Sequence, residues 1–199
     1  MRLSKLILSS SLLVTAMITM TACGVQGTPQ AVDIKPVEKV VTLPNPPAVP
    51  PPTVAKTQKL VQILSGAPEQ PMQQNANDIE VRATTSEQIG TFLTDGNGMT
   101  LYMFTNDGNK KPTCYGACAK TWPPLLIASP GKIYPTGVDP QAIGYVERTE
   151  GTCQVTVNGQ PVYYFSGDKA PGDINGQGVK GTWFAVSPTG GQTPPLPGK

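Results

Sequence analysis

The stretch Tyr102-Met103-Phe104-Thr105-Asn106-Asp107 returns 61 positions later as Tyr163-Tyr164-Phe165-Ser166-Gly167-Asp168, and this recurrence decides the fold. The two copies share Tyr, Phe and Asp at the same spacing, and no gap is needed to align them. A Trp stands 20 residues after each Tyr, Trp122 in the first copy and Trp183 in the second, and the chain has no other Trp. A repeat of this kind predicts two pseudo-equivalent halves, each a single supersecondary unit.

Each half is predicted to contain a β-hairpin. An Asn-Gly pair precedes each copy, at residues 97–98 and 158–159, and Asn-Gly accepts the positive φ angles of a tight hairpin turn. In the strand that follows, Tyr and Phe are two positions apart and therefore share one face. We predict that the aromatic side chains form the core of each half, with an exposed ligand platform as the alternative. These side chains are Tyr102, Phe104, Trp122, Tyr163, Phe165 and Trp183.

The motif Asp residues, Asp107 and Asp168, stand where those strands end. An Asp in this position is suited to accept hydrogen bonds from the backbone of the following loop, and we predict this role rather than a binding site. Asp168 also begins a stretch with Asp173 and Asn175 among glycines, which makes a calcium loop an alternative. The spacing lacks the regular ligand positions of an EF-hand, and plain turns are the preferred interpretation.

The folded part is predicted to be one mostly β domain over residues 79–188. Short segments rich in Val, Thr, Tyr and Phe alternate with Gly, Asn and Asp turns, which is typical of antiparallel strands. Repeat 1 covers about residues 89–127 and repeat 2 about residues 150–188, and residues 189–199 are predicted to be a loose tail. The expected strands are 79–83, 90–93, 100–104, 154–157, 161–165 and 182–186, and one short helix is expected at 115–121.

Residues 1–22 are predicted to be a signal peptide. Arg2 and Lys5 precede an uncharged apolar stretch, residues 6–20, which is shorter than the ~20 apolar residues of a membrane-spanning helix. Met20-Thr21-Ala22-Cys23 resembles the lipobox of bacterial lipoproteins, and an ordinary secretory protein is the alternative. The resemblance implies cleavage before Cys23 and a covalent lipid on that residue, and no other cofactor is predicted. Residues 23–78, which are rich in Pro, are predicted to be a flexible tether.

Composition excludes several classes of function. Removal of the signal peptide takes away two basic residues and leaves equal numbers of basic and acidic ones, so the electrostatic footprint of a nucleic-acid binder is absent. The chain has no His, which excludes Ser–His and Cys–His nucleophile pairs and His-ligated metals. An enzyme is therefore not the expected class.

Three thiols remain once Cys23 carries lipid: Cys114, Cys118 and Cys153. An exported protein resides where disulfides form. Cys114 directly precedes the predicted helix and lies one helical turn before Cys118, within disulfide range, so this pair is predicted, with a bond from Cys153 to either one as the alternative. A thiol-redox site is a further alternative, although the pair does not form the Cys-x-x-Cys motif of thioredoxin-like enzymes.

The two Tyr-x-Phe-x-x-Asp motifs, together with the stretch Cys114–Pro124, resemble a known family of bacterial proteins. These are secreted lipoprotein repeats of unknown function, described as predicted lipoproteins with a Tyr-x-(Phe/Trp/Tyr)-x-x-Asp motif. The resemblance covers about residues 89–188, and the Gly-rich segment 172–178 is similar to the second repeat of the family. It implies a secreted, lipid-anchored protein and brings no established activity.

We therefore expect a membrane-anchored protein of the cell envelope that serves as a non-catalytic binding or structural module. Its expected partners are the lipid bilayer, through the anchor, and another envelope protein or surface component. The outer membrane is favoured in a cell with two membranes, because Gly24 is not the Asp that retains some lipoproteins at the inner membrane. The alternative is a thiol-redox or calcium-handling envelope protein.

Overall fold

The computed structural model describes residues 50–69 and 72–197, so the signal peptide and Cys23 lie outside the described residues. The described part belongs to one compact unit and is mostly β, which confirms the predicted fold class. Its helices are the short α1 (Ala117–Thr121) and the 3-10 turn η1 (Val179–Gly181). The strands are β1 (Thr53–Gln58), β2 (Val61–Ser65), β3 (Asp78–Ser86), β4 (Gly90–Asp95), β5 (Tyr102–Phe104), β6 (Leu126–Ile127), β7 (Gly131–Thr136), β8 (Ile143–Glu147), β9 (Cys153–Val157), β10 (Gln160–Pro161) and β11 (Trp183–Ala185).

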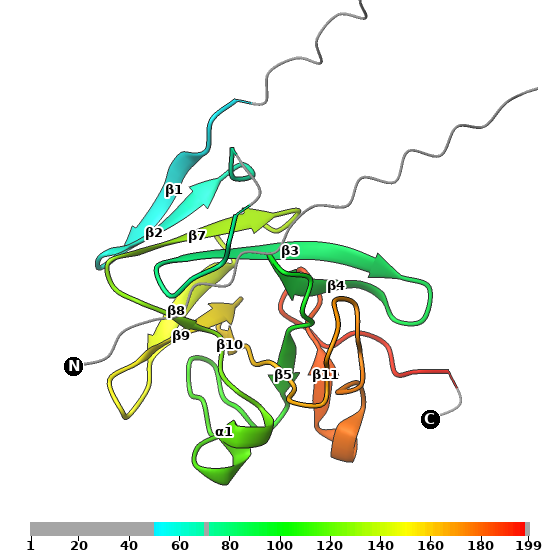
Figure 1. Cartoon of the computed structure of the whole chain (residues 1–199). Helices are drawn as coiled ribbons and strands as arrows, with labels where there is room; N and C mark the ends of the chain where they lie inside the picture. Colours follow the sequence, from blue (N-terminus) through cyan, green and yellow to red (C-terminus); the bar gives the residue numbers. More distant parts are fainter. Residues whose placement is uncertain (1–49, 70–71, 198–199) are drawn as a thin grey trace, which may run out of the picture. The chain divides into compact units, whose positions relative to one another are not determined.

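The strands form three sheets. The largest has the order β1-β2-β7-β3-β4, the second contains β10, β9 and β6 with β8 also paired to β9, and β5 pairs with β11 (Figure 1). Most neighbours are antiparallel, as predicted, but β7 runs parallel to both β2 and β3. These two parallel pairs were not predicted; they arise because β7 comes from the segment between the repeats and is inserted between two earlier strands.

The predicted tether is wrong for residues 53–65, which form β1 and β2 of the largest sheet. Val61 and Ile63 are fully buried on β2, and Leu64 is nearly so. The alternation of Val61 and Ile63 is only three residues long and is flanked by polar and Pro-rich sequence. The pattern is too short to predict a strand. β2 pairs with β1 on one side and with the distant β7 on the other, and the pairing with β7 leaves no local signal.

The predicted loose tail is also wrong for most of its length. The Thr193 backbone N–H donates to the carbonyl of Ala185 at 3.0 Å, and Thr193 is buried. The Gln177 amide donates to Thr193 Oγ1 at 3.1 Å and to the carbonyl of Pro194 at 2.7 Å. Leu196 packs against the aromatic cluster described below. The tail therefore closes over β11 by polar contacts, which its Gly- and Pro-rich composition does not reveal.

The two Asn-Gly turns have different lengths. Asn158 (φ 49°) and Gly159 (φ 84°) are both in the left-handed region, and they join β9 to β10 directly, as the sequence predicts. In the Asn97-Gly98 pair of the first repeat only Gly98 has a positive φ, and the Asp95 backbone N–H donates to the carbonyl of Met99 at 2.9 Å. This loop is one residue longer, and Asp95 Oδ1 stabilises it by accepting the backbone N–H groups of Asn97 and Met99.

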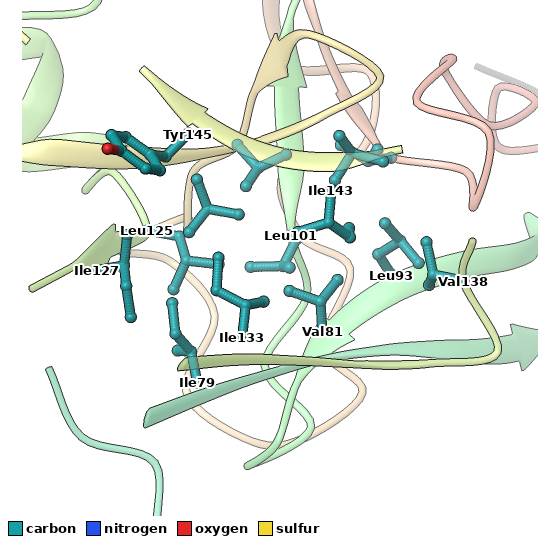
Figure 2. Close-up of a cluster of buried hydrophobic side chains, with 14 of the residues drawn as sticks. Ile79, Val81, Leu93, Leu101, Leu125, Ile127, Ile133, Val138, Ile143 and Tyr145 are labelled. Carbon is teal, nitrogen blue, oxygen red and sulfur yellow. The ribbon is translucent and has the colours of Figure 1, made fainter. Parts of the chain in front are cut away.

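The main hydrophobic core lies between the largest sheet and the β8–β9 pair. Figure 2 shows Ile79, Val81 and Ile133 pointing toward Ile143 and Tyr145. These side chains are buried, and they come from β3, which precedes repeat 1, and from the segment between the repeats. The repeats add further buried side chains to the same core, among them Leu101 and Val155. Within the described residues, no helix has the length and apolar character required to span a membrane. A second, aromatic cluster is separate from this core and contains the repeat motif.

Candidate functional site

The two repeats pair with each other around a pseudo-twofold axis. Tyr102 and Tyr163 exchange backbone hydrogen bonds of 2.8 and 2.9 Å. The Thr105 N–H donates to the carbonyl of Thr182 at 2.9 Å, and the equivalent Ser166 N–H donates to the carbonyl of Thr121 at 2.8 Å. The Trp-bearing segment of each repeat therefore lies against the Tyr-x-Phe segment of the other.

The side chains of the motif are crossed in the same way. The Tyr102 hydroxyl donates to Asp168 Oδ2 at 2.7 Å, and the Tyr163 hydroxyl donates to Asp107 Oδ2 at 2.6 Å. All four side chains are buried. Burial raises the pKa of Asp168, and the hydrogen bond from Tyr102 opposes this rise. The Tyr and Asp of the motif are thus partners between repeats rather than within one repeat.

The second oxygen of each Asp contacts the loop that follows it. Asp107 Oδ1 accepts both the backbone N–H and the hydroxyl of Thr113, each at 2.7 Å. Asp168 Oδ1 accepts the backbone N–H of Asn175 at 3.0 Å. Each motif Asp therefore joins its own loop to the Tyr of the other repeat. The contact with the loop was predicted from the sequence, whereas the contact with the Tyr of the other repeat was not.

The aromatic rings form one continuous stack across the pseudo-twofold axis. Trp122 and Trp183 lie face to face, with centroids 3.9 Å apart and planes 1° from parallel. Phe165 stacks on Trp122 and Phe104 stacks on Trp183, each at 4.3 Å. Tyr102 and Tyr163 meet the edges of the two indoles at 5.5 and 5.3 Å. The expectation of a separate aromatic core in each half is therefore wrong, because the halves share one.

A groove of about 750 Å³ opens over this stack. Trp122 and Trp183 are only 4% and 3% exposed, whereas Phe104 and Phe165 are half-buried. Its lining follows the pseudo-symmetry, with the pairs Phe104/Phe165, Thr121/Thr182, Trp122/Trp183 and Cys118/Val179, to which Asn106, Ala117 and Lys180 are added. Lys180 is the one charged residue among those described that line it. The groove is thus an aromatic surface with hydroxyl and amide groups and one cation.

The structure contains the Cys114–Cys118 disulfide at one wall of the groove, with the two Cα atoms 5.2 Å apart. Arg148, which is 3% exposed, holds this loop: its Nη2 donates to the carbonyl of Cys114 at 2.9 Å, and its Nη1 donates to Gln154 Oε1 at 2.6 Å. The Arg148 guanidinium also lies 4.1 Å from the centre of the Tyr115 ring. Sequence reasoning missed Arg148, because nothing in its neighbourhood distinguishes it from a surface Arg.

Residues 83–126 and residues 144–187 each match the model of a lipoprotein family described as a secreted repeat of unknown function. The chain belongs to this family. The two matches confirm the resemblance read from the motif, and each begins about six residues earlier than the repeat bounds predicted from sequence. Comparison with curated proteins found no match, and comparison with solved structures found none. The family is secreted, which agrees with an extracytoplasmic location.

The acidic residues of the loop that follows Phe165, Asp168 and Asp173, accept hydrogen bonds from backbone N–H groups. Asp173 Oδ2 accepts the backbone N–H groups of Lys169 and Ala170, at 2.7 and 3.0 Å, and these bonds lower the pKa of Asp173. Both oxygens of Asp168 accept hydrogen bonds, Oδ2 from the Tyr102 hydroxyl and Oδ1 from the backbone N–H of Asn175. The described residues include no cluster of three acidic or Cys side chains that could hold a metal ion.

Cys153 is a free thiol in the structure, half-buried at the start of β9. Burial, followed by the nearby Glu147 carboxylate, raises its pKa. Because Cys114 and Cys118 are bonded to each other, the alternative pairing of Cys153 with either one is wrong.

We expect one reactive thiol in the denatured mature protein before reduction and three afterwards. Thiol titration in denaturant, with and without prior reductant, measures this number. A Cys153→Ser variant is the control and is expected to show none before reduction and two after it. Rapid loss of the disulfide in the folded protein under mild reductant would favour a thiol-redox role. Three thiols before reduction would contradict the disulfide.

We expect the protein to lose stability as the pH rises above about 10. Burial, followed by the hydrogen bond to the Asp of the other repeat, raises the pKa of Tyr102 and that of Tyr163 well above the usual value of a Tyr. Below pH 10 these tyrosines are protonated in both states, and the stabilisation is fully present. Above it the unfolded chain releases protons that the folded protein retains, so the free energy of unfolding falls by up to about 1.4 kcal/mol per pH unit for each Tyr.

Urea unfolding at about pH 9 and about pH 11 measures this slope. Tyr102→Phe is expected to reduce the fall in the free energy of unfolding between these two pH values by the contribution of one Tyr. Tyr115→Phe, at a half-buried position, serves as the control. An equal slope in the wild type and Tyr102→Phe would contradict the assignment.

Proposed function

We propose that this protein is a lipid-anchored, non-catalytic binding module of the cell envelope, and that the groove over the aromatic stack contacts its partner. The observation that carries the proposal is the crossed Tyr–Asp arrangement, whose tyrosine rings pack against the edges of the two indoles that line the groove. The hydroxyl of each motif Tyr and both oxygens of each motif Asp are occupied inside the fold. The polar groups of the motif therefore stabilise the fold and are not free to bind a ligand. The surface left for a partner is the lining of the groove.

The lining of the groove favours binding over catalysis. It presents Phe104, Phe165 and two Thr side chains, with no acidic residue among those described, and the chain has no His. General acid–base chemistry depends on such groups. Aromatic residues with few acidic neighbours are instead typical of the central part of a protein–protein interface.

The groove is also rigid before a partner arrives. Its floor is the four-ring stack, and one wall is fixed by the disulfide and by Arg148. A preformed surface loses little conformational entropy on binding, which favours affinity. The partner proposed for it is another envelope protein or surface component.

Site-specific photo-crosslinking tests the groove as the contact surface. A photo-reactive residue in place of Thr121, which is exposed at the rim, is expected to give a discrete adduct in intact envelopes. Adding Lys180→Glu is expected to reduce that adduct, because it reverses the one charge of the lining. The same probe at Lys132, an exposed position on β7, is the matched control. Equal labelling at both positions would contradict the proposal.

The anchor at Cys23 is tested separately. Cys23→Ser is expected to move the protein to the soluble fraction, or to leave it unprocessed and without acyl label. A processed Cys23→Ser protein that stays in washed membranes without any partner would contradict the anchor, and the outer membrane is the expected location in a two-membrane cell.

A further inference from the structure

A second pocket, of about 230 Å³, shares no residue with the aromatic groove. Three separate segments line it: β1, the loop after β5, and the β8–β9 unit with its turn. The side chains that matter for its chemistry are Lys56 and Gln58 from β1, Asn109 and Lys110 from the loop, and Gln141 and Asn158 from the third segment. The pocket thus joins the N-terminal hairpin, repeat 1 and repeat 2.

The walls of this pocket are held together by short hydrogen bonds. The Lys110 backbone N–H donates to the carbonyl of Gly159 at 2.7 Å, and the Asn158 N–H donates to the carbonyl of Ala142 at 2.6 Å. Gln58 bonds the backbone of Tyr145 twice, through its amide at 3.0 Å and its carbonyl oxygen at 3.3 Å. A side chain at Gly159 would collide with Asn109. The pocket is therefore a built feature of the fold and not a gap between mobile loops.

The charged side chains that line this pocket are all basic among the described residues. Lys56 and Lys110 both line it, and none of the described lining residues is acidic. Lys56 Nζ donates to the carbonyl of Gln141 at 2.8 Å, which leaves two of its three N–H groups for a ligand. Burial and the charge of Lys110 lower the pKa of Lys56. Asp139 lies outside the lining, where its Oδ1 accepts the backbone N–H of Gln141 at 2.8 Å, and its charge offsets part of the positive charge by raising the pKa of Lys56.

We propose that this pocket binds a phosphate group between Lys56 and Lys110. Lys is a common phosphate ligand because its ammonium group acts as a point charge. The amide groups of Asn109 and Gln141 add neutral donors around the two cations. A volume of about 230 Å³ holds a phosphate with several waters, since each water occupies about 30 Å³. The phosphate belongs either to a free ion or to a phospholipid headgroup.

Binding is measured on the mature lipoprotein in neutral detergent micelles at low ionic strength, where ion pairs are least screened. One arm titrates inorganic phosphate by calorimetry, and the other titrates short-chain phosphatidylglycerol. Lys110→Gln is the test variant, because Lys110 is exposed and its side chain has no role in the fold's hydrogen bonds described above. Lys132→Gln on β7 is the matched control, and denaturant melts verify that both variants are folded.

We expect Lys110→Gln to raise the Kd about fivefold, as the loss of one exposed ion pair does, and Lys132→Gln to leave it unchanged. Combining Lys110→Gln with Lys56→Gln is expected to abolish binding. Binding of inorganic phosphate supports a free-ion site, and binding of phosphatidylglycerol alone supports a headgroup site. No saturable binding of either probe, or equal binding by the wild type and Lys110→Gln, would overturn the proposal.

Discussion

Replacement of either Trp122 or Trp183 with Ala is expected to lower the free energy of unfolding by about 3–5 kcal/mol. Both indoles are almost completely buried, and each is covered by the other indole on one face and by a Phe on the other. Removing one therefore opens a cavity in the middle of the stack and exposes one face of its partner. Because the two sites are related by pseudo-symmetry, we expect similar losses.

Denaturant unfolding of the two single variants and of the double variant measures these losses. Since the rings are in contact, the double variant is expected to lose less than the two single losses combined. Leu60→Ala is the control: this side chain is 65% exposed, and its removal is expected to change stability by less than about 0.5 kcal/mol. A costly Trp183→Ala together with a silent Trp122→Ala would show that the rings do not form one stack in solution.

Removal of the N-terminal hairpin is expected to have an even larger effect. A chain that begins at Asp78 lacks β1 and β2 and leaves β7 without one of its two neighbours. The buried side chains of Val61, Ile63 and Leu64 are lost, and each contributes about 1.5–3 kcal/mol. The combined loss is comparable to the total stability of a typical domain, about 5–15 kcal/mol, so this chain is expected not to fold.

A chain that begins at Pro50 is the matched control for this truncation. It keeps both strands of the hairpin and is expected to unfold at nearly the same denaturant concentration as the mature protein. Circular dichroism and denaturant melts distinguish the two chains. A cooperative, near-native transition in the chain that begins at Asp78 would contradict the role of β2 in the sheet.

The repeat made much of the fold predictable, because its motif contains the residues with the strongest pattern. Tyr and Phe at alternate positions predict β5, and the Asn-Gly pair predicts the β9–β10 turn. The region 126–147 has no such pattern, and its three strands β6, β7 and β8 were not predicted. β7 forms because β2 and β3 flank it in space, and such long-range pairing leaves little trace in local sequence.

The sequence predicts which residues belong to the candidate site, but it does not predict which Tyr contacts which Asp. A 61-residue shift shows that Tyr102 and Tyr163 are equivalent, but it does not show which Asp each one contacts. Pairing within a repeat and pairing between repeats leave the same sequence pattern. The groove was missed for a related reason, since Phe104 and Phe165 resemble core residues and become half-exposed only at the two ends of the stack.

The central claim is that the repeats complete each other, and double-mutant cycles on the motif test it most directly. Tyr102→Phe combined with Asp168→Asn is expected to give a coupling energy of about 1–3 kcal/mol, because these side chains share a buried 2.7 Å hydrogen bond. Tyr102→Phe combined with Asp107→Asn, the pair within one repeat, is expected to couple by less than about 0.5 kcal/mol. Strong coupling within the repeat and none across it would contradict the crossed arrangement.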